Sequence, residues 1–374
     1  MSDPCAIGRR GTHAGRFVGR EREVAELRAL LRDERVITLS GAGGVGKTRL
    51  ASRVAELERA RGAGEVWRVE LERVADPSLI MRELARSLGV RSPTLDRSVA
   101  GTRRGFGGPA GGVLAHLRAA RGLVVLDGCE HLRDGCAELV RELAGSCPGV
   151  RILVTGRRPL GIAGELVRRV PPLALPCHGR PDAEAVMLFV DRALAAGGRV
   201  VNGGMGDVER LCRMLDGMPL ALELAAARTR SLTPAQILHR IGRRHGLPAE
   251  GSARTVPAVV EWSHELLRPK ERVLLRRLPV FAGPFDLELA GRVCADGGIV
   301  RRGELPGLLG GLVRDALVVR QADGGHRLHA VVREYAAERS REAAEEAWLR
   351  DRHLRAIRER RHESAPPTRQ GGRS

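Results

Sequence analysis

Aromatic residues make up only 2% of the chain, which leaves too few rings for a base-stacking platform that binds single-stranded nucleic acid. No run of about 18 apolar residues occurs, and this excludes an ordinary transmembrane helix. The basic start at residues 1–16 lacks the apolar segment of a secretory signal, and we expect it to be disordered. These absences predict a cytoplasmic protein without a membrane partner, whose 374 residues are enough for two or three domains.

Cysteine pairs at the spacing of a metal site are missing as well. The seven cysteines are scattered along the chain, are odd in number and never form a CxxC pair. This distribution argues against a zinc site or a disulfide framework, and it favours reduced thiols as in the cytosol.

Lysine is nearly absent, although the chain is strongly basic. Lys and Arg together number 63 against 45 acidic residues, so the net charge is +18, yet the only lysines are Lys47 and Lys270. Such an excess of positive charge predicts an anionic partner. However, arginine pairs occur all along the chain and make no single stripe, so the sequence does not favour nucleic acid as that partner.

The clearest motif lies at residues 36–48, where an apolar β-branched run enters a glycine-rich turn and then a helical pattern. It matches the phosphate loop GxxxxGK[ST] in its expected context, with a strand before it and a helix after it. The glycines let successive N–H groups point at an anion, and the helix adds its positive N-terminal end. Lys47 is expected to reach the β- and γ-phosphates, and Thr48 to bind Mg²⁺. The residues predicted to hold the nucleotide here are Gly41, Ala42, Gly43, Gly44, Val45, Gly46, Lys47, Thr48 and Arg49.

Strands and helices alternate in the first part of the chain, which indicates an α/β domain with a parallel sheet and helices on both faces. We expect this P-loop nucleotide-binding domain to span residues 17–177, with a mobile Gly/Arg/Ser-rich insertion at 91–112. The expected strands are 35–40, 65–71, 122–127 and 151–155, and the expected helices are 17–31, 48–61, 77–88, 113–120 and 131–143.

The pattern changes after two consecutive prolines at 171–172, because only helices follow. They are expected at 183–196, 207–215, 219–227 and 234–241, in a helical domain at 178–250 that a linker at 245–257 ends. Two short strands at 316–320 and 326–329 around a glycine turn then make residues 251–340 look like a winged-helix domain. We expect a charged helix at 339–361 and a disordered tail at 364–374. Residues 341–374 therefore lie outside the predicted domains.

A phosphate loop needs an acid that holds Mg²⁺ at the end of a neighbouring strand, and Asp127 is placed to supply it. The next position, where a second acid often orients the attacking water, is Gly128. Glu130 either polarises that water or merely begins the following helix, and we therefore expect slow hydrolysis. Arg157 follows another strand and is either a sensor of the γ-phosphate or a solvated arginine. Lys47, Asp127, Glu130 and Arg157 are the predicted catalytic set, and Thr48 and Asp127 the predicted metal ligands.

The ordered set of motifs resembles the NB-ARC branch of the STAND ATPases, and within it the AfsR-like regulators of actinobacteria. The motifs are FVGRERE at 17–23, the phosphate loop, VVLDGCEH at 124–131, ILVTGR at 152–157, LDGMPLAL at 215–222 and LHA at 328–330. The resemblance implies that Val18, Gly19, Arg20 and Pro219 border the adenine of ATP or ADP. It also implies that His329 touches the β-phosphate of ADP from the winged-helix domain.

The chain departs from this family at Gly128 and Gly156, which puts hydrolysis in doubt, and it carries neither the usual effector module nor the helical repeats. We therefore interpret it as a nucleotide-controlled switch that self-associates with ATP or binds an effector protein in trans. One alternative is a regulator that binds DNA directly through its winged helix, and another is a truncated remnant. A metabolic phosphotransferase would need a second substrate site, for which the sequence shows no constellation.

Overall fold

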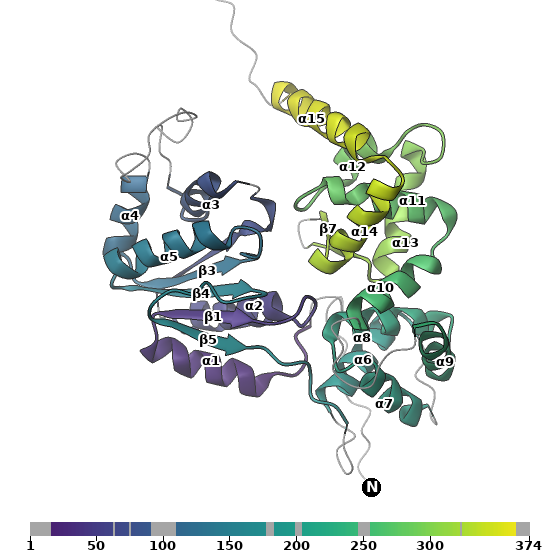
Figure 1. Ribbon diagram of the computed structural model, residues 1–374, viewed down its shortest axis with the longest axis horizontal. Coiled ribbons are helices and arrows are strands. Elements are labelled where there is room, and N and C mark those ends of the chain that lie inside the picture. The colour runs from purple at the N-terminus through teal and green to yellow at the C-terminus, as the bar shows by residue number, and fades with distance from the viewer. Residues whose placement is uncertain are drawn as a thin grey trace, which may run out of the picture. The chain divides into compact units, whose positions relative to one another are not determined.

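A computed structural model describes residues 16–62, 64–74, 76–90, 110–176, 183–198, 204–245, 255–321 and 324–363 (Figure 1). The chain divides into two compact units, residues 1–256 and 257–374, and each is treated by itself. The expected disordered start, most of the insertion at 91–112, most of the linker at 245–257 and the tail at 364–374 fall outside the described residues. No helix among those described is both long enough and apolar enough to cross a membrane.

The first unit contains a parallel five-stranded sheet in the order β2-β3-β4-β1-β5, and this confirms the predicted α/β fold class. The strands are β1 (Val36–Ser40), β2 (Glu65–Glu70), β3 (Gly122–Asp127), β4 (Val150–Gly156) and β5 (Glu165–Arg169). Strands β1 and β3 are fully buried, as expected for a sheet covered on both faces. Strand β5 was not predicted. It is an edge strand that pairs with β1, and its mostly exposed residues give no apolar run.

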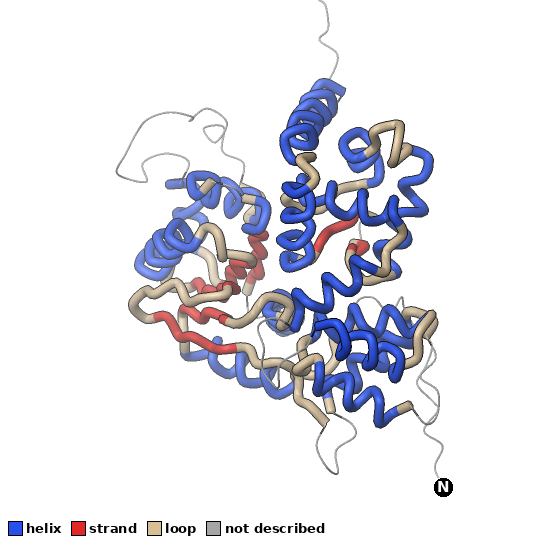
Figure 2. The backbone as a smooth tube through the Cα atoms, turned by 45° about the vertical axis from the view of Figure 1, so that its right-hand side comes forward, coloured by secondary structure: helices blue, strands red, loops and turns tan. Residues whose placement is uncertain are grey.

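Helices cover both faces of this sheet, as Figures 1 and 2 show. The helices are α1 (Glu21–Asp33), α2 (Lys47–Arg61), α3 (Ile80–Ser87), α4 (Ala110–Ala119) and α5 (Arg133–Ser146). Helices α3, α4 and α5 contact one another and share an apolar core with the sheet, while α1 contacts α2. Helix α5 begins two residues later than expected, so Glu130 lies in the turn before it.

The remainder of the first unit is helical, as the sequence indicates. It comprises α6 (Glu184–Ala195), α7 (Met205–Met214), α8 (Pro219–Ala227) and α9 (Pro234–His245). Pro219 stands at the first position of α8, where its missing N–H costs nothing. Helix α8 packs against α6 and is buried along nearly its whole length. This burial holds its N-terminus firmly in place beside the sheet domain.

The second unit combines helices with one antiparallel hairpin. Its elements are α10 (Thr255–Glu265, which begins in the first unit), α11 (Pro269–Arg277), α12 (Leu287–Cys294), α13 (Leu305–Arg314), β6 (Val318–Arg320), β7 (His326–Leu328), α14 (Ala330–Glu342) and α15 (Glu346–Glu363). Short 3₁₀ turns occur in both units, at Leu71–Arg73, Pro77–Leu79, Arg228–Arg230, Leu278–Val280 and Arg302–Glu304. The pairing of β6 with β7 confirms the predicted hairpin. Trp262 is 1% exposed and therefore belongs to the core of this unit.

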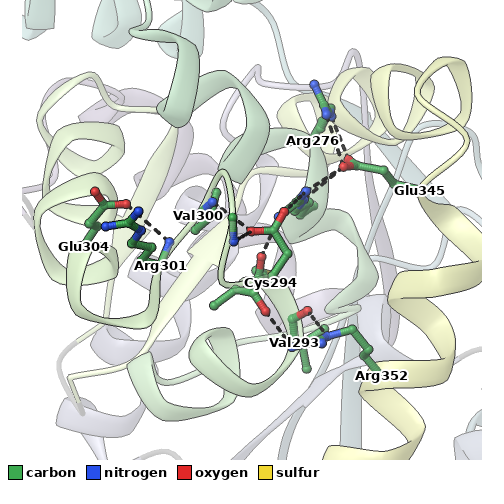
Figure 3. Close-up of polar contacts among 12 residues, drawn as sticks. Arg276, Val293, Cys294, Val300, Arg301, Glu304, Glu345 and Arg352 are labelled. Carbon is green, nitrogen blue, oxygen red and sulfur yellow. Dashed lines mark hydrogen bonds and ion pairs between the residues drawn. The ribbon is translucent and has the colours of Figure 1, made fainter.

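The prediction of one charged helix over 339–361 is wrong. Helix α14 ends at Glu342, Ala344 takes a φ of 54°, and α15 begins at Glu346. The carboxylate of Glu345 accepts hydrogen bonds from Arg276 at 2.7 and 3.1 Å (Figure 3). Arg352 on α15 donates to backbone carbonyls at the C-terminal end of α12, including that of Val293 at 2.9 Å (Figure 3). These contacts bend the chain back onto its own unit, so α15 is part of the second unit.

Candidate nucleotide-binding site

The phosphate loop lies between the end of β1 at Ser40 and the start of α2 at Lys47. Gly44 and Gly46 have φ values of 80° and 96°, in the left-handed region that favours glycine. A Cβ atom on Gly44 would stand 2.9 Å from the Cβ of Leu220, so even alanine would collide with α8. The backbone N–H of Leu220 in turn donates to the carbonyl of Gly44 at 3.2 Å. The loop is thus shaped by its glycines and held from outside by the N-terminus of α8.

Lys47 is 7% exposed and lies across the loop. Its Nζ donates to the carbonyls of Gly41 at 2.9 Å and Ala42 at 3.0 Å. Burial lowers the pKa of this amine, the charge of Glu130 raises it, and Arg157 lowers it further. The ammonium is therefore preorganised at the mouth of the loop, where it has two weak neutral acceptors and, among the described residues, no carboxylate in direct contact. A phosphate would be a stronger partner.

Asp127 ends β3 and is 6% exposed. Its Oδ1 accepts hydrogen bonds from the hydroxyls of Thr48 at 2.8 Å and Thr155 at 2.6 Å. Thr155 comes from β4, which lies between β3 and β1 in the sheet. The structure thus brings together the two residues predicted as metal ligands, Thr48 and Asp127, on oxygen atoms that Mg²⁺ favours.

Arg68 is a site residue that the sequence did not indicate. From β2, its Nη2 donates to Oδ2 of Asp127 at 3.1 Å and lies 3.8 Å from a carboxylate oxygen of Glu70. Oδ1 of Asp127 is already bonded to two hydroxyls, so Arg68 completes the set of partners around this carboxylate. A positive charge at this position competes with a cation for the same oxygen.

Arg68→Gln is expected to lower the Mg²⁺ concentration that half-saturates nucleotide binding or hydrolysis by about threefold to tenfold, because it frees Oδ2 of Asp127. The effect is modest because the Arg68 side chain is 34% exposed and partly screened by water. A Mg²⁺ titration at fixed ATP measures it, and Arg68→Lys, which keeps the charge, should stay near the wild type. An increased Mg²⁺ requirement in Arg68→Gln would show that Arg68 orients the carboxylate instead.

Glu130 and Arg157 lie near the same edge of the sheet, since the charges of both act on Lys47. Glu130 is exposed in the turn after β3, and Arg157 follows directly on β4. Gly128, in the position after Asp127, has a φ of 81° and a backbone N–H that donates to the Thr155 hydroxyl at 3.1 Å. A Cβ atom at this position would lie 3.3 Å from both the Cβ and the backbone nitrogen of Glu72. The four predicted catalytic residues are therefore neighbours, although their roles stay predictions.

Arg20, implied by the family resemblance, is 3% exposed and has a φ of 64°. Its Nη2 donates to the carbonyl of Val45 in the phosphate loop at 2.7 Å and to that of Pro171 at 2.9 Å. Its backbone N–H donates to Glu184 at the start of α6 at 2.6 Å. Its other terminal nitrogen, Nη1, is buried without a hydrogen-bond partner among the described residues. Such a donor is costly unless a ligand satisfies it.

The other predicted contacts fall into three groups. Half-buried Val18 and buried Gly19 belong to the same turn as Arg20, and Pro219 comes within 3.9 Å of a Cβ built on Gly46. Arg49 donates to Glu223 of α8 at 2.5 Å, so its guanidinium is engaged within the protein. His329 lies at the N-terminal boundary of α14 in the second unit, and its contact with a nucleotide stays a prediction.

These residues fit the phosphates of a nucleotide with Mg²⁺. The glycine cradle has no room for a side chain at Gly44, Lys47 and the unpartnered Nη1 of Arg20 are donors, and Thr48 and Asp127 supply oxygen ligands. When bound, Mg²⁺ would neutralise phosphate charge. The protein supplies the amides, the cations and the ordered carboxylate, all held by neighbouring elements before any ligand binds.

Comparisons with known proteins agree with this geometry. A family model described as an AAA domain matches residues 30–160. The uncharacterized protein Rv0894 of Mycobacterium tuberculosis is 40% identical over 346 residues, covering 89% of this chain and 83% of that protein. Regulatory protein AfsR of Streptomyces coelicolor is 30% identical over 320 residues, covering 80% of this chain and 29% of that protein.

Among solved structures, the STAND protein PH0952 of Pyrococcus horikoshii, which has a tetratricopeptide repeat sensor, is similar in fold. The TM-score is 0.56 at 17% identity, over 96% of this chain and 47% of that one. The predicted resemblance to STAND ATPases and to AfsR-like regulators is thus confirmed. The chain belongs to the same family as Rv0894, matches the AAA domain at residues 30–160, is related to the AfsR regulators and has the fold of a STAND ATPase.

Proposed function

We propose that this chain is an ATP/ADP-controlled switch that regulates transcription or signalling by nucleotide-dependent self-association or by binding an effector protein. The observation that carries the proposal is the preformed cradle, in which the phosphate loop, Lys47 and the Thr48–Asp127 pair are already ordered. The N-terminus of α8 bonds the same loop, so a nucleotide seated there would touch both the sheet domain and the helical segment. Such a ligand can bias their arrangement.

Slow hydrolysis suits such a switch, and two features support it. Gly128 provides no carboxylate next to Asp127, and Glu130, the nearest later acid, is exposed in a turn. A water molecule in line with the γ-phosphate would therefore lack a closely held base. A nucleotide that is cleaved slowly keeps the protein in one state long enough for a partner to bind.

In this proposal the second unit is the part of the protein that changes its position. The pairing of β6 with β7 supports our proposal that this unit is a winged helix, and His329 follows the hairpin directly. In the ADP state His329 would touch the β-phosphate and hold the closed form, and in the ATP state Arg157 would engage the γ-phosphate. Contacts that differ between two states supply coupling of about 1–3 kcal/mol, which is enough to change the dominant form.

Native mass spectrometry of the purified chain tests this directly, because ADP should co-purify with it. His329→Ala is expected to speed ADP release by about tenfold, as one lost hydrogen bond to a charged group predicts, and to favour oligomers. Stopped-flow release of a fluorescent ADP analogue and the native mass are the two readouts. His326→Ala provides a matched control, because His326 lies three residues before His329, on strand β7 of the hairpin. An ADP release rate and a mass equal to those of the wild type would eliminate the latch.

A second candidate function is direct DNA binding through the hairpin, and the pairing of β6 with β7 after α13 is the observation that favours it. Arg320 at the end of β6 is exposed and is the natural residue to change. Loss of sequence-selective DNA binding in Arg320→Ala, with ATP affinity unchanged, would favour this function over the switch acting through proteins.

A further inference from the structure

A hollow of about 610 Å³ lies at the edge of the sheet where its strands begin, opposite the phosphate loop. The edge where the strands begin is the left-hand edge of the sheet in Figure 1, away from α8. The end of α1, the turn between α4 and β3, and the start of β4 form its walls. Two acids, Asp33 and Glu34, stand against five arginines in its lining: Arg32, Arg35, Arg118, Arg121 and Arg151.

Internal ion pairs do not neutralise these arginines. Within the part of the chain that the structure describes, none of the five is paired with a carboxylate. Arg35 donates instead to the carbonyls of Ala144 and Cys147, both at 2.7 Å, and Arg151 donates to that of Arg32 at 3.3 Å. Two guanidinium groups are thus fixed by backbone. Like charges gathered around one hollow repel one another, and a bound anion would relieve that repulsion.

Helix dipoles explain only part of this cluster. Arg32 and Arg118 lie in the last turns of α1 and α4, where a cation is favourable in any protein. Arg35 and Arg121 lie outside any helix, and Arg151 is on strand β4. Three of the five arginines therefore have no such structural reason to converge.

We propose that this arginine-lined hollow binds the phosphate backbone of nucleic acid, with duplex DNA as its ligand. Guanidinium groups bind phosphate oxygens in a bidentate manner, and no aromatic side chain lines the hollow, so the contact would read phosphates and not bases. The volume is of the size that holds a nucleotide-sized ligand.

A second hollow favours a polymer over a small phosphate compound. It measures about 270 Å³ and shares Arg32 and Arg151 with the first hollow. Its other charged lining residues are Arg28, Arg61, Glu58 and Glu65. Arg28 is paired with Glu58, so its contribution is reduced. Arg61 is therefore the residue that extends the row of arginines past the first hollow, in the way that contact with a strand backbone requires. The net charge of +18 would draw such a polyanion toward the protein.

The test is fluorescence anisotropy with a labelled duplex of about 20 bp and arbitrary sequence, at salt concentrations between about 50 and 200 mM. The double variant Arg118→Ala/Arg121→Ala is expected to bind at least about tenfold more weakly and to reduce the salt slope by about 1–2. The matched control is Arg22→Ala/Arg210→Ala, which removes the same charge from exposed arginines paired with Glu26 and Asp207. Its affinity should stay within about threefold of the wild type.

Other results would overturn the proposal. An equal loss in both double variants would mean that net charge alone binds DNA, and a loss confined to Arg320→Ala would place the DNA on the hairpin. Inorganic polyphosphate or polyglutamate that binds while the duplex does not would replace the nucleic acid with another polyanion. Lys47→Ala should leave duplex binding unchanged, and Arg118→Ala/Arg121→Ala should keep its ATP affinity, so this proposal and the nucleotide switch fail separately.

Discussion

Lys47→Ala is expected to weaken binding of ATP with Mg²⁺ by about 100-fold or more. Nζ of Lys47 is buried and bonds the carbonyls of Gly41 and Ala42, and it can exchange these neutral acceptors for phosphate oxygens. Hydrogen bonds to charged groups contribute about 1.5–3 kcal/mol each, and two of them correspond to a factor of about 100 or more in affinity. Isothermal titration calorimetry with ATP and a non-hydrolysable analogue measures the loss.

The chain offers an unusually close control, because it has only one other lysine. Lys270 lies on α11, where its Nζ pairs with Glu304 at 2.6 Å. Lys270→Ala should leave ATP affinity within about twofold of the wild type, since this pair is largely exposed. Lys47→Arg keeps the positive charge but replaces the compact ammonium with a planar guanidinium, which should fit the loop poorly and weaken ATP binding. An ATP affinity of Lys47→Ala within about threefold of the wild type, with thermal unfolding unchanged, would refute the assigned phosphate loop.

The elements that could be predicted are those whose signal is local. Strand β1, the loop and the start of α2 follow from one short stretch in which an apolar run, glycines and a helical pattern meet. Asp127 could be identified because it ends an apolar strand that is buried throughout. Strand β5 gave no such signal, because an edge strand buries little and needs no apolar alternation.

Arg68 could not be found from the sequence because its role depends on the order of the strands. Arg68 can reach Asp127 because β2 lies next to β3 in the sheet. In the register of these two strands Glu70 stands opposite Asp127. Arg68 is two residues before Glu70, so both side chains share one face of the sheet. The break between α14 and α15 was missed for a similar reason, because the partners of Glu345 come from α11, far away in the sequence.

The second large effect is expected in the stability of the second unit. The side chain of Arg277 is 4% exposed and donates to Glu345 at 2.8 and 3.1 Å, to Asp296 at 2.9 Å and to the carbonyl of Cys294 at 2.8 Å. Its guanidinium also lies 5.0 Å from the ring centre of Trp348 on α15. Burial would raise the pKa of Glu345, yet hydrogen bonds from Arg276 and Arg277 outweigh it, so the pKa is lowered. The pKa of Asp296 is lowered in the same way. Burial would raise it, but hydrogen bonds from Arg277 and from the backbone N–H groups of Val300 and Gly298 outweigh that effect.

Arg277→Ala is expected to destabilise the second unit by about 3 kcal/mol, because it leaves two carboxylates and a carbonyl without their shared buried donor. For a unit of this size the midpoint of thermal unfolding should fall by on the order of 10 °C, as measured by calorimetry. Arg276→Ala is the matched control, because its side chain is 26% exposed and bonds the same Glu345, so we expect a loss of about 1 kcal/mol or less.

The pH dependence of Arg277→Ala separates lost ion pairing from lost packing. Because the folded-state pKa values of Glu345 and Asp296 are lowered, their stabilising effect is present above the unfolded pKa of about 4 and is lost as the pH falls through the lower folded values. The stability difference between the wild type and Arg277→Ala should therefore shrink on acidification from about pH 6 to pH 3. A difference that stays constant over this range would show that the arginine acts through packing on Trp348, and not as the counter-charge that holds α15 in place.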